Sequence, residues 1–254
     1  MQRKPKARRK QPEDVSAGWS RMNRTGIQTS PLDSQEMIAG AAGERGGRDD
    51  GEALAVRKRY LEEGEPIGSM PPPGTVKGAA RMVKDLLTGA RGTVLIDRIA
   101  ERLAFERSGT RLYDALLTKH AVLGSFDGGP SRADLQHIRN EEHQHFLMLH
   151  EVLEMLGADP TAVTPSADLS GVESRGVMEV VTDPRTTLPQ ALHAILVAEL
   201  ADWAGWDLLI GLVSELGQDE LAERFGRAHE EEQEHLRKVR TWLTNHTSRL
   251  AAGK

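Results

Sequence analysis

The chain has 254 residues, a formal net charge of −5 and no cysteine. The absence of cysteine excludes disulfides, thiolate metal sites and a rubredoxin-type iron centre. No apolar run approaches the length of a membrane span, and residues 1–10 lack the apolar core of a signal peptide, so we expect a cytoplasmic protein with no membrane span.

The charge is unevenly distributed along the chain. Residues 1–10 carry six Lys or Arg and no acid, whereas the remainder has 27 basic and 38 acidic residues, a net charge of −11. A basic tip on an acidic body favours a solvated tail over a nucleic-acid-binding domain, and we expect no specific nucleic-acid binding. The alternative for the tip is docking on an acidic partner, a membrane surface or a nucleic acid.

The first third of the chain is poor in apolar residues. Residues 1–73 are predicted to form a disordered or partly ordered extension, with a short helix at residues 52–62 and a proline-rich stretch at residues 66–74. Residues 74–92 are predicted to be a linker or a short helix that packs on the body, because residues 76–87 have helical periodicity.

Four long helical patterns follow, at residues 93–121, 132–156, 188–216 and 218–245. Each has apolar residues about every 3.5 positions, which predicts that residues 93–247 form an all-α, antiparallel four-helix bundle. Short connections join the first helix to the second and the third to the fourth. Residues 158–187 are predicted to form a long crossover between helices two and three, with one short helix near residues 171–181.

Charged residues interrupt each apolar stripe at positions that should face the core. They are Glu106 in the first helix, Glu142 and His145 in the second, Glu199 and Asp202 in the third, and Glu232 and His235 in the fourth. An ionised carboxylate is costly to bury unless it is paired or binds a metal, so we expect these side chains to converge. One Glu from each of two helices and a Glu-x-x-His from each of the other two suffice for two metal ions.

The position of each apolar stripe also indicates which of two adjacent glutamates faces the core. Glu142 and Glu232 lie on their stripes and are predicted ligands, whereas Glu141 and Glu231 lie on the flank. Asp202 has two interpretations. It orients a histidine ligand by accepting a hydrogen bond from the ring N–H, or it makes a buried hydrogen bond to a neighbouring helix.

The two hairpins have the same order of elements, which indicates an internal repeat. Glu106 is followed seven residues later by Tyr113, and Glu199 is followed at the same interval by Trp206. Together with Glu142-x-x-His145 and Glu232-x-x-His235, these residues resemble the ferritin-like superfamily, particularly its rubrerythrin-like and manganese-catalase-like members, over residues 93–245.

The resemblance implies a role for each of these residues. Glu106 and Glu199 would be terminal ligands, Glu142 and Glu232 would bridge two metal ions, and His145 and His235 would each bind one of them. Tyr113 matches a tyrosine that hydrogen-bonds a ligand and relays electrons, and Trp206 stands where an aromatic or polar neighbour of the ligands is common. The metals would be iron or, as the alternative, manganese.

Two functions of different classes follow. The first is a di-metal oxidoreductase of the peroxidase, catalase or ferroxidase type, acting on peroxide, O₂ or Fe(II). The second is a metal-stabilised interaction or cargo module whose N-terminal tail docks to a protein partner, with little or no catalysis. Long bundles with surface aromatic residues such as Trp203 often pair, so we also expect a homodimer or a higher homo-oligomer.

Overall fold

The computed structural model describes residues 35–36, 38–40, 51–65, 67, 69–70, 74 and 91–253. The chain divides into two compact units, residues 1–65 and residues 66–254. In the first unit, helix α2 (Gly51–Glu63) confirms the predicted short helix. Residues 35–36 and 38–40 are also helical, which the sequence did not predict. The predicted helix at residues 76–87 and most of the predicted extension lie outside the described residues.

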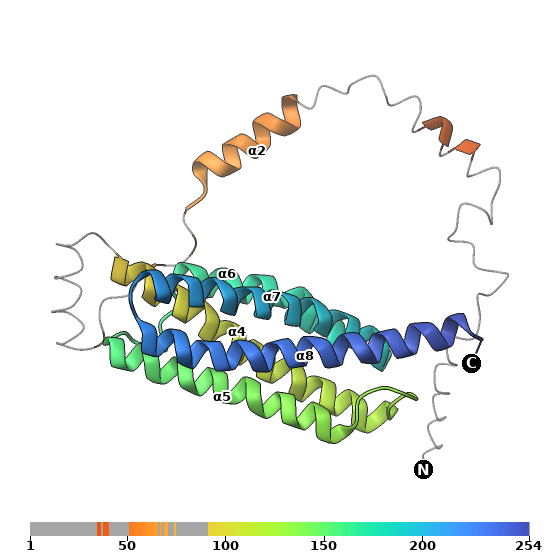
Figure 1. Cartoon of the computed structure of the whole chain (residues 1–254). Coiled ribbons are helices and arrows are strands. Elements are labelled where there is room, and N and C mark those ends of the chain that lie inside the picture. The colour runs from red at the N-terminus through yellow and green to blue at the C-terminus, as the bar shows by residue number, and fades with distance from the viewer. Residues whose placement is uncertain are drawn as a thin grey trace, which may run out of the picture. The chain divides into compact units, whose positions relative to one another are not determined.

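The second unit is all-helical in its described residues. Its helices are α4 (Arg91–Leu123), α5 (Arg132–Leu156), α6 (Pro165–Thr182), α7 (Leu188–Glu215) and α8 (Asp219–Ala251). The long helices lie side by side, with contacts from α4 to α5 and α7 and from α8 to α5 and α7, and α6 packs on α4 and α7 (Figure 1). Among the described helices, none combines the length and the apolar character that crossing a membrane requires.

Local signals fix where the helices begin and end. Ser131 caps α5 by accepting the backbone N–H of Asp134, whose carboxylate accepts the N–H of Ser131 in return. Thr187 and Gln190 make the same reciprocal cap at the start of α7. Helix α5 ends at Gly157, whose φ of 81° lies in the left-handed region that glycine adopts without strain. These caps set the register of α5 and α7 and therefore which of their side chains face the core.

Helices α6 and α8 depart most from the ranges that the sequence predicts. Helix α6 spans residues 165–182 instead of 171–181, because Thr164 caps its start and Ser166 anchors the first turn on Asp97 of α4. Helix α8 continues six residues beyond the predicted end at residue 245. Asn245 donates to the main-chain oxygen of Gly128 at 2.9 Å, and Arg249 pairs with Asp127, so the loop between α4 and α5 supports the extra turns.

The core of the second unit consists of two apolar clusters. One cluster includes Ile99, Leu149, Leu209 and Phe225, and the other includes Leu116, Ile138, Ile195 and Val239. On each of the four long helices, the buried carboxylates and histidines fall between the members of the two clusters. The fold therefore encloses a polar layer between two apolar ones.

Candidate metal centre

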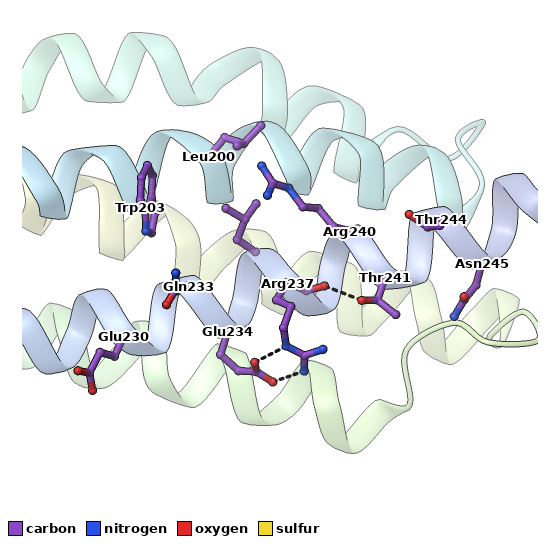
Figure 2. Close-up of a pocket in the computed structure, with 11 residues that line it drawn as sticks. Leu200, Trp203, Glu230, Gln233, Glu234, Arg237, Arg240, Thr241, Thr244 and Asn245 are labelled. Atoms are coloured by element: carbon purple, nitrogen blue, oxygen red, sulfur yellow. Dashed lines mark hydrogen bonds and ion pairs between the residues drawn. The ribbon is translucent and has the colours of Figure 1, made fainter.

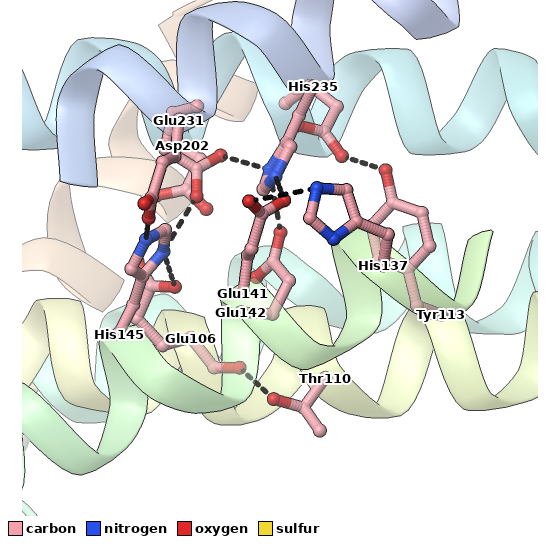
Figure 3. A network of polar contacts seen from close by, with 12 residues as sticks. Glu106, Thr110, Tyr113, His137, Glu141, Glu142, His145, Asp202, Glu231 and His235 are labelled. Carbon is pink, nitrogen blue, oxygen red and sulfur yellow. Dashed lines mark hydrogen bonds and ion pairs between the residues drawn. The ribbon is translucent and has the colours of Figure 1, made fainter. Parts of the chain in front are cut away.

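The charged residues of the polar layer come from all four long helices and meet in one place (Figure 3). The six predicted ligands, Glu106, Glu142, His145, Glu199, Glu232 and His235, each expose 3% or less of their surface. Their potential ligand atoms form two groups in which all atoms lie within 4.8 Å of one another. The first group is Glu142, Glu199, Glu232 and His235, and the second is Glu106, His145 and Glu232. The structure thus brings all six together, and Glu232 belongs to both groups.

Each histidine is held by a carboxylate from the opposite helix. Nε2 of His145 on α5 donates to Glu231 on α8 at 2.7 Å, and Nε2 of His235 on α8 donates to Glu141 on α5 at 2.9 Å. Nε2 carries the proton in both rings, because an ionised carboxylate can only accept. Nδ1 therefore faces inward, at 2.9 Å from Glu232 in His145 and at 3.2 Å from Glu232 in His235. Both Nδ1 atoms are positioned to bind a cation.

Glu141 and Glu231, which were predicted to lie on the flank of the stripes, therefore hold the two histidine rings. They are partly exposed, with 22% and 46% of their side chains accessible, and they fix the ring orientation of the two histidines from outside. Glu141 also lies 3.2 Å from the exposed ring of His137. The signal that could have found them is the repeat itself, since both hairpins carry Glu-Glu-x-x-His in the same register.

The crowding of carboxylates changes the protonation of the group. Burial, followed by the charge of Glu232, raises the pKa of Glu199 to about 8. Burial would also raise the pKa of Glu232, but the charge of His235 and the adjacent ring of His145 lower it to about 2. Burial opposes the charged form of His145, yet the carboxylates of Glu106 and Glu231 beside its ring raise its pKa well above the usual value. The cluster therefore retains protons at neutral pH that a bound cation would replace.

Several buried oxygen atoms of the cluster lack a hydrogen-bond partner. They are both carboxylate oxygens of Glu106 and one oxygen of each of Glu142, Glu199 and Glu232. A buried acceptor without a donor costs about 1–3 kcal/mol, so this arrangement is unfavourable unless another positive group is present. Carboxylate oxygen and imidazole nitrogen are donors that manganese, iron and zinc accept in proteins. The residues present therefore fit metal ions.

Two aromatic residues border the cluster at equivalent positions of the repeat. The hydroxyl of Tyr113 on α4 donates to Glu199 on α7, and burial followed by the charge of Glu199 raises the pKa of Tyr113, which keeps the phenol protonated. The ring of Trp206 lies edge-on to His145, with centroids 5.7 Å apart, and its buried Nε1 has no hydrogen-bond partner. Both predicted neighbours of the ligands are therefore in contact with ligand residues.

Asp202 does not orient a histidine, so the first interpretation of this residue is wrong. Its Oδ1 accepts from Nη1 of Arg102 on α4 at 2.5 Å, which is the buried bond to a neighbouring helix given by the second interpretation. An oxygen of Asp202 nevertheless lies within 4.8 Å of oxygens of Glu106, Glu142 and Glu232. Arg102 was not singled out from the sequence, although it lies one turn before Glu106 on the same helix face.

Gly109 on α4 is a further residue that the sequence did not single out. A Cβ atom at this position would lie 2.0 Å from Oε2 of Glu142, far inside the contact distance of carbon and oxygen. Only glycine leaves the space that the Glu142 carboxylate occupies. Gly109 therefore contributes to the centre by leaving space for the Glu142 carboxylate.

A groove on the outer side of α7 and α8 is separate from this centre (Figure 2). Leu200, Trp203 and Leu236 contribute apolar surface, and Arg237 and Arg240 contribute positive charge. Arg237 is paired with Glu234 at 2.5 Å. The groove is lined by none of the six predicted ligands.

Comparison of the chain with family models, with curated proteins and with solved structures gives no match. The centre is therefore interpreted from its own residues. The structure contains buried groups of Glu and His that could hold metal ions.

Proposed function

We propose that residues 93–247 form a ferritin-like four-helix bundle that holds two ions of iron or manganese and acts as an oxidoreductase on peroxide, O₂ or Fe(II). One observation carries this proposal. Two groups of buried ligand atoms share Glu232, and each contains a histidine whose Nδ1 faces the carboxylates while its Nε2 proton is tied to an outer glutamate. This ligand inventory is that of the di-metal carboxylate sites of helix bundles.

The proposal assigns the ligands in pairs. Glu106 and His145 would hold one ion and Glu199 and His235 the other, and Glu142 and Glu232 would serve both. When bound, such a metal pair supplies two-electron exchange with peroxide or O₂. Iron would favour ferroxidase or peroxide-reducing activity, and manganese would favour peroxide disproportionation.

The surrounding residues prepare the site for this chemistry. Glu141 and Glu231 keep the Nε2 protons outside, so that the ligating nitrogens need not reorganise. Tyr113 holds Glu199 through its hydroxyl and is the phenol in contact with a ligand. The two apolar clusters above and below the polar layer limit the access of water, which strengthens electrostatic interactions within it.

Metal analysis with a matched pair of variants tests the proposal. Purified protein should contain two metal ions per chain and oxidise Fe(II) or consume peroxide. Glu142→Gln combined with Glu232→Gln should lose both metals and turnover, because the shared carboxylates are gone. Glu154→Gln combined with Glu230→Gln changes exposed glutamates of the same two helices and should match the wild type. Metal-free wild-type protein with no turnover, and a ligand variant of unchanged melting temperature, would refute the proposal.

A second function is favoured by helix α2. Its side chains Leu54, Tyr60 and Leu61 expose 64%, 73% and 84% of their surface, an unusual exposure for large apolar groups on one short helix. They would suit a protein partner, as expected of an interaction or cargo module whose N-terminal extension docks. Deletion of residues 1–73 separates the two functions, because the oxidoreductase retains turnover without the extension whereas the docking module loses its partner.

A further inference from the structure

Arg102 is a buried cation beside the metal centre that no part of the proposed chemistry uses. It exposes 3% of its surface, and its Nη1 donates both to Oδ1 of Asp202 at 2.5 Å and to the main-chain oxygen of Asp202 at 3.1 Å. Two bonds from one nitrogen to the same residue fix Asp202 relative to α4. The pair joins α4 to α7 at the edge of the polar layer.

The surroundings of the guanidinium are shaped to receive it. Its Cζ lies 4.4 Å from the centroid of the Phe105 ring, a distance at which a cation is attracted to an aromatic face. Gly205 on α7 also adjoins the guanidinium, and a Cβ atom there would lie 2.5 Å from Cζ and Nη1 of Arg102. A side chain at Gly205 would therefore displace the guanidinium, so the site for Arg102 is built by both helices.

Asp202 lies close enough to the ligands to compete with them. One of its oxygens is within 4.8 Å of oxygens of Glu106, Glu142 and Glu232. A carboxylate this close to the ligand oxygens would turn towards a bound ion unless another positive group held it. Arg102 is that group, because it occupies Oδ1 of Asp202 and the adjacent main-chain oxygen.

The number of buried charges in the polar layer is consistent with a role for Arg102 in holding Asp202. Within the described part of the chain, the buried carboxylates are Glu106, Glu142, Glu199, Asp202 and Glu232, and the buried guanidinium is Arg102. With neutral histidines as ligands, these residues leave four negative charges, which two divalent cations neutralise. Without Arg102, the layer would contain one uncompensated carboxylate.

We propose that Arg102 is a positioning residue that withholds Asp202 from the metal ions and thereby fixes the charge of the centre at the value that two divalent cations balance. The proposal rests on the proposed function, since it requires two bound ions. It assigns Asp202 to Arg102 and leaves the six ligands as the complete set. It also makes Arg102 and Asp202 act in opposite directions on metal affinity.

Opposite signs make the proposal testable by a double-mutant cycle. Arg102→Met removes the restraint and frees Asp202 to bind, so the weaker of the two Mn(II) ions should bind about tenfold tighter or more. Asp202→Asn leaves an unpaired buried cation that repels the ions, so both should bind about ten- to a hundredfold more weakly. The double variant restores the charge balance and should return to within a few-fold of the wild type.

The experiment is an anaerobic titration of the full chain with Mn(II), followed by electron paramagnetic resonance and by metal analysis of the protein after gel filtration. A pair that only supports the fold predicts that both single variants weaken binding and that the double variant does not recover, and either result overturns the proposal. If Arg102→Met does not fold by circular dichroism, Asp202→Asn and the double variant carry the test. The double variant must then bind Mn(II) about tenfold tighter than Asp202→Asn, and equal affinities overturn the proposal.

The outcome for the wild type separates this inference from the function on which it rests. Wild-type protein that binds two Mn(II) ions while the cycle shows no sign reversal removes only the role of Arg102. Wild-type protein that binds no Mn(II) and no Fe(II) removes the proposed function, and the inference with it.

Discussion

His235 on α8 donates its Nε2 proton to Glu141 on α5 across 2.9 Å, and the same bond is repeated in the opposite direction between His145 and Glu231. The outer carboxylates fix each ring with Nδ1 turned inward. They thereby remove a choice of tautomer that a free histidine would have to make on binding a cation. The orientation of the two histidine rings therefore depends on Glu141 and Glu231, which are not themselves predicted ligands.

The first prediction concerns these outer glutamates. Glu141→Ala should weaken one bound ion by about ten- to a hundredfold, because the ring of His235 loses its acceptor, and Glu231→Ala should do the same for the ion held by His145. Titration with Mn(II) followed by electron paramagnetic resonance measures both constants. Glu230→Ala, an exposed neighbour of Glu231, is the control. Equal affinities in all three variants would contradict the assignment.

The second prediction concerns pH. The pKa of Glu199 is about 8 in the folded chain, above its usual value of 4.5, so this carboxyl contributes stability that is complete below about 4.5 and is lost as pH rises to about 8. The raised pKa of His145 acts in the same direction above about 6.5. The pKa of Glu232 is about 2, so its contribution is lost only as pH falls below about 4.5. Metal-free protein should therefore melt at lower temperature at pH 8 than at pH 5.

Bound metal should reverse that trend, because cations and protons compete for the same atoms. The melting temperature followed by circular dichroism should fall with pH in the presence of a chelator and rise with pH in excess Mn(II). Glu199→Gln should reduce the slope in chelator, since its amide does not titrate. Parallel curves with and without metal would show that the cluster does not exchange protons for cations.

The third prediction separates Tyr113 from the other tyrosine of the chain, Tyr60. Tyr113→Phe removes a donor to the buried carboxylate of Glu199 and should lower the free energy of unfolding by about 1–3 kcal/mol while metal content is retained. Turnover should also fall if the phenol relays electrons. Tyr60 is 73% exposed on α2, so Tyr60→Phe should change neither quantity. Chemical denaturation and stopped-flow oxidation of Fe(II) provide the two measurements.

The fourth prediction uses helical glycines with opposite surroundings. Gly109→Ala places a methyl group 2.0 Å from Oε2 of Glu142, so it should impair metal binding although every ligand remains. Gly211 has no atom within 4 Å of the corresponding position, so Gly211→Ala should stabilise α7 by about 0.5–1 kcal/mol through helix propensity. Metal analysis and thermal melting of the two variants test both signs. A Gly109→Ala variant with normal metal content would show that Glu142 is free to move.

The sequence was a good guide to the helices and to which of their faces are buried. The predicted range of α5 matches the observed one, because Ser131, Asp134 and Gly157 are strong boundary signals. Helix α6 was predicted too short, since Gly171 and Gly176 weaken its pattern and its first turn depends on a contact with Asp97 of another helix. A contact between distant segments leaves no periodic trace in the local sequence.

Contacts between distant segments were also missed at the candidate metal centre. Its six inward-facing residues were found because a charge on an apolar stripe is visible in the sequence. The pair of Arg102 and Asp202 was not, because its partners are 100 residues apart and only Asp202 had been noticed as an intrusion. Gly109 escaped for a different reason, since a residue that contributes only space has no chemistry to detect.

The crossing of the outer hydrogen bonds has a consequence for the two halves of the second unit. The hairpin of α4 and α5 contains His145 but takes the acceptor for its ring from α8, and the hairpin of α7 and α8 contains His235 but takes its acceptor from α5. Neither half contains both a predicted histidine ligand and the carboxylate that accepts from its ring. If residues 91–156 and 188–251 were produced as separate fragments, each would bind metal ions weakly. Metal binding would then promote the association of the two fragments.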